Sequence, residues 1–95
     1  MAETLVDERD GRVAGFLSLI GNEVGAIFVD PTMHGLGIGR GLMDRASSLR
    51  PHLELGVFEA NEVGRRFYDL YGFRETDRGI HVQTGQAELR LRLDP

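Results

Sequence analysis

The sequence predicts an α/β fold with a mixed, mostly antiparallel sheet, a central parallel pair of strands and two helices. Three observations predict this class. Short apolar segments separated by turn residues occupy both ends of the chain, two middle segments carry apolar residues at helical spacing, and a strand lies between those two segments. A strand–helix–strand crossover gives a parallel pair, and hairpins give antiparallel pairs. The predicted order is β-β-β-α-β-α-β-β, in a single domain over residues 1–95.

Three strands joined by tight turns are predicted for the first part of the chain. Residues 4–8 and 12–20 form the first two, because Arg9-Asp10-Gly11 between them has the composition of a hairpin turn. Gly21-Asn22 is the next turn signal, and the third strand covers residues 23–30. Its apolar run over residues 26–29 predicts burial on both faces. Gly15 indicates a bulge or a close approach of another backbone.

Two helices and three strands are predicted for the remainder. The first helix covers residues 39–49 and stops at Pro51, and residues 53–58 alternate as a strand. The second helix opens at Asn61 or Glu62 and ends at Gly72. Strands near residues 73–78 and 87–93 close the chain, with a loop over residues 79–86. The apolar positions of the two helices are Leu42, Met43, Ala46 and Leu49, and Val63, Phe67, Leu70 and Tyr71.

Composition excludes several kinds of chemistry. The chain has no cysteine, which removes disulfides, thiolate metal sites and a cysteine nucleophile. All 11 basic residues are arginine, so neither a Schiff-base lysine nor a phosphate-loop lysine is available. A net charge of −4 argues against a sequence-independent nucleic-acid binder. With no signal peptide, no apolar spanning run and no metal-ligand spacing, we expect a cytoplasmic protein without membrane segment or metal.

The glycine loop between the third strand and the first helix is the most informative segment. Glycine at every second position lets backbone approach a ligand closely, and the helix start aims free N–H groups at an anion. The loop fails the dinucleotide pattern because Leu42 stands where glycine is needed, and it fails the P-loop pattern for want of lysine. It fits R/Q-x-x-G-x-G/A, with His34 first and with Gly37 and Gly39 as its glycines.

Four linked features give the chain a resemblance to the GNAT superfamily of acyl-CoA N-acyltransferases. They are residues 13–16 (VAGF), residues 27–31 (IFVDP), the loop over residues 34–40, and residues 61–73 (NEVGRRFYDLYGF). The last segment is similar to the family signature Asn…Phe-Tyr-x-x-x-Gly-Phe. The resemblance implies an acetyl-CoA-dependent N-acetyltransferase that passes the acetyl group directly to an amine. The alternative is a non-catalytic acyl-CoA-binding or regulatory module.

The resemblance also implies which residues hold the acyl donor, acetyl-CoA. Its pyrophosphate would lie on the loop amides and the helix start, and its pantetheine arm beside the third strand, as an added strand would. The strand over residues 53–58 would splay away and leave a slot for the thioester, whose carbonyl a main-chain N–H polarises. Asn61 would cap its helix and contact the pantetheine arm or a water. The implied donor-binding residues are Phe28, Val29, His34, Gly35, Leu36, Gly37, Ile38, Gly39, Arg40 and Asn61.

Tyr68 and Glu23 are the implied catalytic residues. Tyr68 occupies the position of the signature tyrosine that protonates the departing thiolate, and a phenol with a pKa of about 10 suits that role. Its alternative role is packing, which Phe67 already supplies. Glu23 stands where several members carry a general base, and a solvated carboxylate is the alternative. Other candidate bases are His34, His52 and His81.

The chain departs from the family pattern at its start. Members usually have a strand and two helices before the hairpin, and this chain begins almost at the hairpin. A minimal form, a truncated sequence, or a homodimer whose partner supplies the missing wall would each explain this. Exposed strands over residues 4–8 and 88–93 would allow such pairing. The acceptor would be a small-molecule or peptide amine, and the acidic surface favours a cationic one.

Overall fold

The computed structural model describes residues 2–94, which fall into two compact units divided between Leu53 and Glu54. The predicted order of strands and helices is confirmed, and a short 3-10 helix, η1, is added to it. The elements are β1 (Ala2–Arg9), β2 (Arg12–Ile20), β3 (Glu23–Val29), η1 (Pro31–Met33), α1 (Ile38–Leu49), β4 (Leu53–Phe58), α2 (Glu62–Tyr71), β5 (Arg74–Ile80) and β6 (Ala87–Leu93). Neither α1 nor α2 has the length and apolar composition to cross a membrane.

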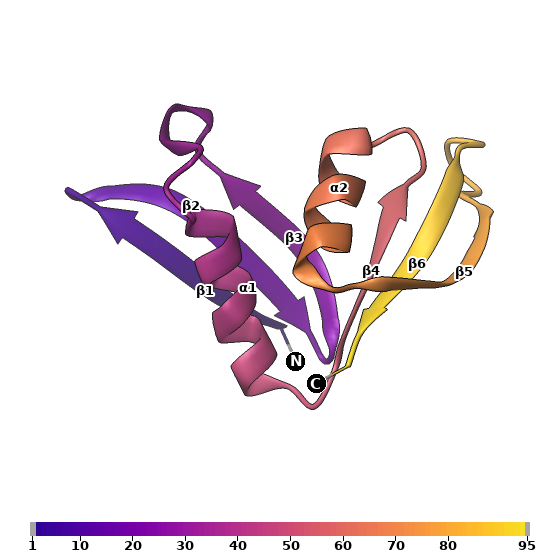
Figure 1. Ribbon diagram of the computed structural model, residues 1–95, viewed down its shortest axis with the longest axis horizontal. Helices are drawn as coiled ribbons and strands as arrows, with labels where there is room; N and C mark the ends of the chain where they lie inside the picture. The colour runs from indigo at the N-terminus through magenta and orange to yellow at the C-terminus, as the bar shows by residue number, and fades with distance from the viewer. Residues whose placement is uncertain (1, 95) are drawn as a thin grey trace. The chain divides into compact units, whose positions relative to one another are not determined.

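The first unit is an antiparallel meander of β1, β2 and β3 with α1 packed on one face (Figure 1). Alternate residues of β2 turn toward the helix, so Leu17 and Leu19 are fully buried. The helix contributes residues one turn apart, as a helix that buries one stripe must. Its buried residues are Ile38, Leu42, Met43 and Ala46. Leu49, at the last position of α1, is exposed, so its predicted place in the apolar stripe is wrong.

The turns of this unit confirm the hairpin predictions. Asp10 and Gly11 have φ values of 52° and 76°, so both central residues of the β1–β2 turn are left-handed, as a two-residue hairpin requires. Gly21 has a φ of 60° at the start of the β2–β3 turn. These turn residues therefore set the register that brings β2 against both of its neighbours.

Gly15 shows both features that its position in β2 predicts. A Cβ atom there would lie 2.6 Å from the carbonyl oxygen of Phe28 and 3.0 Å from Cγ2 of Ile38. The register also shifts beside it, because Asp7 pairs with Gly15 whereas Glu8 pairs with Val13. The extra residue of this bulge bends the strand locally. The missing side chain at Gly15 is therefore what lets α1 and β3 approach β2 together.

The prediction that β3 is buried on both faces is wrong. Val24 is the one residue of β3 that is buried, and Phe28 is 45% exposed. Phe28 pairs with Phe16, and their rings stack with centroids 5.7 Å apart. Phe16 alternates with the residues that face α1, so this ring pair lies on the opposite face of the unit. A strand is buried on both faces only when both are covered, and α1 covers one.

The second unit contains β4, α2 and the β5–β6 hairpin. Its strand order is β4-β6-β5, β5 and β6 are antiparallel, and Figure 1 draws β4 and β6 in opposite directions. The strand β5 extends to Ile80, so the predicted loop shortens to residues 81–86. This loop is closed by hydrogen bonds from the His81 N–H to the Gln86 carbonyl (2.8 Å) and from the Gly85 N–H to the His81 carbonyl (2.7 Å).

The predicted exposed edge over residues 88–93 is also wrong. The hairpin returns β6 to pair beside β4, so β6 is an interior strand of the unit and β5 lies outside it. All seven residues of β5 are exposed, and four of them are charged. Charged side chains on an outer strand oppose pairing with another chain. In the first unit, β1 does lie at the outer position of its meander, as predicted.

The helix α2 begins and ends where the sequence predicts. The Asn61 Oδ1 accepts a hydrogen bond from the Gly64 N–H (3.0 Å), and Gly72 ends the helix with a φ of 119°. The predicted apolar stripe is only partly correct, because Val63 is 83% exposed and Leu70 is 74% exposed. The aromatic rings of the helix instead pack toward the buried ring of Phe73. Val63 and Leu70 project at other angles around the helix axis. The rings of this cluster are Phe67, Tyr68, Tyr71 and Phe73.

Candidate functional site

The donor loop, residues 30–37, connects β3 to α1 through two left-handed glycines. Gly35 has a φ of 87° and Gly37 has a φ of 75°, values that side-chain-bearing residues rarely adopt. Neither position has a heavy atom within 4 Å of where a Cβ would stand, so conformation and not crowding explains these glycines. Along the loop into α1, Ile38 is buried against the unit, whereas His34, Leu36 and Arg40 are exposed. The backbone of the loop is therefore open to a ligand.

Asp30 anchors the start of this loop. Its Oδ1 accepts hydrogen bonds from the Thr32 N–H (2.9 Å) and the Thr32 hydroxyl (2.7 Å), and its Oδ2 accepts one from Nη2 of Arg12 (3.0 Å). Its own N–H donates to the Ala14 carbonyl (2.8 Å). The hydrogen bonds from Thr32, followed by the nearby Arg12 charge, hold the pKa of the Asp30 carboxyl below its usual value. Sequence reasoning missed this role, although Asp-Pro-Thr after a strand is a recognisable turn signal.

The two helices begin differently. The N-cap of α1 is Gly37, no side chain caps its first turn, and that turn contains no acidic residue. The N-cap of α2 is Asn61, whose side chain bonds the first turn, and Glu62 adds a negative charge there. In α2 the protein thus bonds one first-turn N–H and places a negative charge at the positive dipole end, whereas the start of α1 has neither. The start of α1 can accept an external anion such as a phosphate.

Phe28, Val29 and Glu23 all lie on β3, but not together. Phe28 and Val29 are the last two residues of the strand and precede the donor loop directly. Glu23 is the first residue of the strand, pairs with Ile20 and is exposed. Seven residues of extended chain place Glu23 about 20 Å from the loop end of β3. Glu23 therefore lies at the opposite end of the strand from the donor loop.

In the second unit, Asn61 and Tyr68 lie two helical turns apart on one side of α2. The ring of Tyr68 is half-buried, with edge-on contacts to Phe67 (5.5 Å between centroids) and Phe73 (5.6 Å). This burial raises the pKa of the Tyr68 phenol, because desolvation disfavours the phenolate. Tyr68 therefore contributes to packing and also carries a phenol that stays protonated at neutral pH.

The three histidines have different surroundings. His34 is exposed at the entry to the donor loop, and His52 is partly exposed directly after Pro51. His81 packs edge-on against Phe58 (5.2 Å between centroids), and its Nδ1 lies 3.1 Å from the Thr84 hydroxyl. Across residues 2–94, no group of three or more His, Asp and Glu side chains is placed to hold a metal ion. The absence of a metal stays a prediction.

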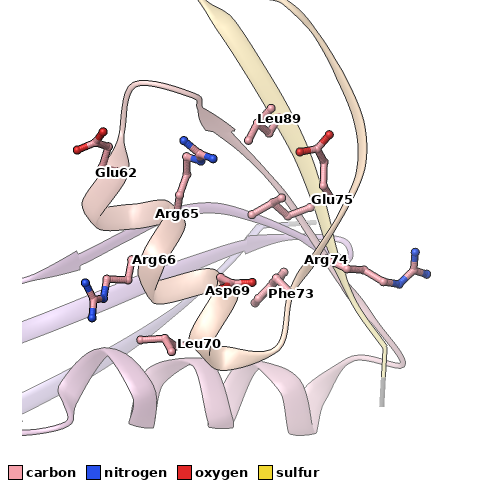
Figure 2. A pocket seen from close by; sticks show the side chains of 10 residues that line it. Glu62, Arg65, Arg66, Asp69, Leu70, Phe73, Arg74, Glu75 and Leu89 are labelled. Carbon is pink, nitrogen blue, oxygen red and sulfur yellow. The ribbon is translucent and has the colours of Figure 1, made fainter.

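A cavity of about 830 Å³ lies within the second unit, beside α2, β5 and β6 (Figure 2). Its apolar lining comes from Leu70, Phe73, Leu89 and Leu91. Charged side chains of α2 and β5 stand around it. It includes none of the predicted site residues. Sequence reasoning missed it because its walls come from three separate elements. Its full lining is Glu62, Arg65, Arg66, Asp69, Leu70, Phe73, Arg74, Glu75, Leu89 and Leu91.

A glycine loop that leads into an uncapped helix start is typical of proteins that bind phosphate-bearing ligands. The family model described as an acetyltransferase (GNAT) domain matches residues 2–75 of the chain. The peptidyl-lysine N-acetyltransferase YjaB of Escherichia coli (strain K12) is 44% identical over 73 residues, which cover 77% of this chain and 49% of that relative. The chain belongs to the GNAT acetyltransferase family.

Solved structures agree with this assignment. The solution structure of apo-form YjaB from Escherichia coli superposes with a TM-score of 0.81 at 36% identity, over 93% of this chain and 60% of that one. The PaiA N-acetyltransferase of Thermoplasma acidophilum, solved with coenzyme A, gives a TM-score of 0.82 at 21% identity, over 99% of this chain and 61% of that one. This second likeness shows the fold alone. The predicted α/β class and family are confirmed, and the chain spans about half the length of the curated relatives it matches.

Proposed function

We propose that residues 1–95 act as one acyltransferase domain that transfers an acetyl group from acetyl-CoA directly to an amine. The observation that carries this proposal is the start of α1, which is open, uncapped and preceded by two left-handed glycines, in a chain of the GNAT family. The coenzyme A in the PaiA N-acetyltransferase structure supports the same ligand class.

The donor is held by backbone more than by side chains in this proposal. The pyrophosphate lies on the N–H groups of the donor loop and of the first turn of α1, and the pantetheine arm follows β3 past Val29 and Phe28. His34 and Arg40 are exposed at this end and supply polar or charged contacts to the phosphates. Asn61 keeps its cap bond through Oδ1 and donates from Nδ2 to the arm or a water. The remaining donor contacts are the backbone of Gly35, Leu36, Gly37, Ile38 and Gly39.

The chemistry needs one proton acceptor and one proton donor. Glu23, directly or through water, takes a proton from the ammonium form of the acceptor, and the neutral amine attacks the thioester carbonyl carbon. A carbon–nitrogen bond forms, the carbon–sulfur bond breaks, and the leaving thiolate takes the Tyr68 phenolic proton. The new amide nitrogen then loses its second proton to the Tyr68 phenolate, which restores the phenol. The raised pKa of Tyr68 keeps the phenolic proton in place at neutral pH. The remote position of Glu23 on β3 suits it to the thioester end of the arm, away from the phosphates.

The acceptor proposed is the side-chain amine of a lysine in a peptide or protein. YjaB is named a peptidyl-lysine N-acetyltransferase, and this supports the assignment. We also propose a cytoplasmic protein that forms a homodimer through the outer strand β1 and needs neither a metal nor a nucleic acid.

A discriminating experiment measures free thiol release with acetyl-CoA and a lysine peptide, and then analyses the peptide by mass spectrometry. Because the chain contains no lysine, every acetyl-lysine detected in an untagged reaction lies on the acceptor. Gly37→Glu places a carboxylate and a Cβ at the anion end of α1, and we expect it to abolish coenzyme A binding in calorimetry. Gly21→Glu, at another left-handed turn glycine, is the matched control and keeps binding.

The alternative is an acyl-CoA-binding module without catalysis. Coenzyme A binding that is lost in Gly37→Glu, together with no turnover on any amine of a broad panel, would establish that alternative. Binding that is indifferent to Gly37→Glu would contradict the proposed donor site itself.

A further inference from the structure

Glu59, the residue directly after β4, holds the turn that leads into α2 by three separate hydrogen bonds. Its N–H donates to the Ala87 carbonyl (2.9 Å), its carbonyl accepts from Nη1 of Arg65 (2.9 Å), and its Oε2 accepts from Nη1 of Arg78 (3.0 Å). These bonds come from β6, α2 and β5 respectively. One residue is thereby tied to every other element of its unit.

Arg78 is itself fixed from the other side. Its Nε and Nη2 donate to the two carboxylate oxygens of Glu75 (3.1 and 2.9 Å), which is a two-pronged geometry that restricts the guanidinium. The hydrogen bond from Arg78 also lowers the pKa of the Glu75 carboxyl. Arg65 and Glu75 face the cavity of this unit (Figure 2). We call the alternating charges Glu59, Arg65, Glu75 and Arg78 the Glu59 clamp.

The turn held by this clamp carries Asn61. The Asn61 N–H donates to the Phe58 carbonyl (2.9 Å), and the Arg65 N–H donates to the Asn61 carbonyl (3.0 Å). Asn61 therefore lies two residues after the anchored Glu59 and four before the anchoring Arg65. A rotation of the turn would move the Asn61 side chain and the whole first turn of α2.

We infer that the Glu59 clamp is a positioning device that presents Asn61 to the acyl donor, an inference that rests on the proposed function. Arg78 and Glu59 are positioning residues, because they act through the turn and not by touching the donor. Their side chains are 56% and 48% exposed, and exposed ion pairs contribute little to global stability. The clamp should therefore affect donor affinity far more than the melting temperature.

The decisive experiment removes one charge of each sign. Arg78→Met and Glu59→Gln should each raise the KM for acetyl-CoA about five- to tenfold and change kcat less than twofold. Acetyl-CoA is anionic, so a simple field effect would weaken donor binding in Arg78→Met and strengthen it in Glu59→Gln. If the clamp positions Asn61, both changes weaken donor binding. The double variant should then lose no more affinity for acetyl-CoA than either single variant.

Two further variants separate positioning from general damage. Arg78→Lys keeps one charged donor and should recover part of the affinity. Arg74→Met removes an exposed arginine of the same strand that pairs with Asp94 (3.0 Å), and it should leave KM unchanged. Opposite shifts in Arg78→Met and Glu59→Gln, or an equal effect of Arg74→Met, would overturn the inference.

A measurement without donor distinguishes this inference from the proposed function. Hydrogen exchange of the Gly64 N–H reports the bond to Asn61 directly. It should accelerate severalfold in Arg78→Met and Glu59→Gln and stay at the parent rate in Arg74→Met. Unchanged exchange in Arg78→Met and Glu59→Gln would contradict the inference that the clamp positions Asn61. Accelerated exchange in these two variants, together with a parent chain that binds no coenzyme A, would support the clamp as the holder of Asn61 and contradict the proposed function.

Discussion

Burial decides how the Tyr68 phenol can act, because the same aromatic contacts that pack the ring also raise its pKa. A phenol with a raised pKa remains protonated across the physiological range and can give its proton to a leaving thiolate. Nothing in the spacing of residues 61–73 reports this burial. It depends on Phe73 folding back against α2 from the start of the next strand.

Tyr68→Phe should reduce kcat by about a hundredfold or more, because it removes the proposed acid and keeps the ring. Coenzyme A affinity should stay within about twofold of the parent. In the parent, kcat should stay constant with rising pH until the phenol ionises, because the pKa of Tyr68 lies above its usual value of about 10. Steady-state kinetics over a pH series checks both expectations. Tyr71→Phe is the matched control, and a parent-like kcat in Tyr68→Phe would reduce Tyr68 to a packing residue.

Asp30 gives the donor loop a defined response to acid. Its folded-state pKa is lowered, so its ionised form stabilises the fold above the unfolded pKa of about 3.9, and that contribution is lost as the pH falls through the folded-state pKa. Asp30→Asn should therefore be less stable than the parent at pH near 7, and the difference should shrink toward pH near 3. Urea unfolding at both pH values measures it. Thr32→Val removes the hydroxyl donor, so a pH response unchanged in Thr32→Val would contradict the assigned cause.

At the scale of elements, β2, β3 and α1 approach one another closely at a glycine. The missing side chain at Gly15 leaves room for the Phe28 carbonyl and the Ile38 side chain, which lie 2.6 and 3.0 Å from where a Cβ would stand. The strand before the donor loop and the helix after it are thereby packed against the same residue of β2. The start of α1, where we propose that the acyl donor binds, depends on this close approach.

Gly15→Ala should destabilise the chain by about 1–3 kcal/mol, because the neighbour within 3.0 Å is backbone and must shift. Gly41→Ala, inside α1 with open space at its Cβ position, should instead stabilise it by about 0.5–1 kcal/mol through helix propensity. Chemical denaturation of the two variants beside the parent provides the comparison. Two changes of the same sign would show that glycine content, and not the contact, governs the result.

The elements also show where periodicity misleads. The bounds of β2, β4 and β6 and the caps of α2 follow directly from turn residues and alternation. The apolar runs of β3 and α2 do not predict burial, since Phe28, Val63 and Leu70 are exposed. Hydrophobicity in one segment cannot say which faces another segment will cover.

For the whole molecule, charge is the property with a direct functional consequence. A chain with a net charge of −4 should attract a cationic acceptor peptide and repel an acidic one. All 11 basic residues are arginine. Because the chain has no lysine, the proposed acetylation of lysine side chains does not change its own charge.

The kcat/KM for a lysine peptide flanked by arginines should exceed that for the same lysine flanked by glutamates. This preference should fall as salt rises from about 0.1 M to about 1 M, where the Debye length shrinks from about 10 Å to about 3 Å. Initial rates for both peptides across this range provide the measurement. A preference that is constant with salt would mean that direct contacts, and not the field of the chain, select the acceptor.

Local sequence was enough to predict the order of elements, the donor loop, the ends of α2 and the family, because turns, caps and glycine positions depend on neighbouring residues. The anchoring of Asp30 by Arg12, the contact made possible by Gly15, the interior place of β6 and the Glu59 clamp could not be predicted in this way. Apart from the Glu75–Arg78 pair of the clamp, each joins residues at least six positions apart, and most join different elements. Such contacts exist only after the strands and helices have packed, and for this reason the tertiary structure alone decided them.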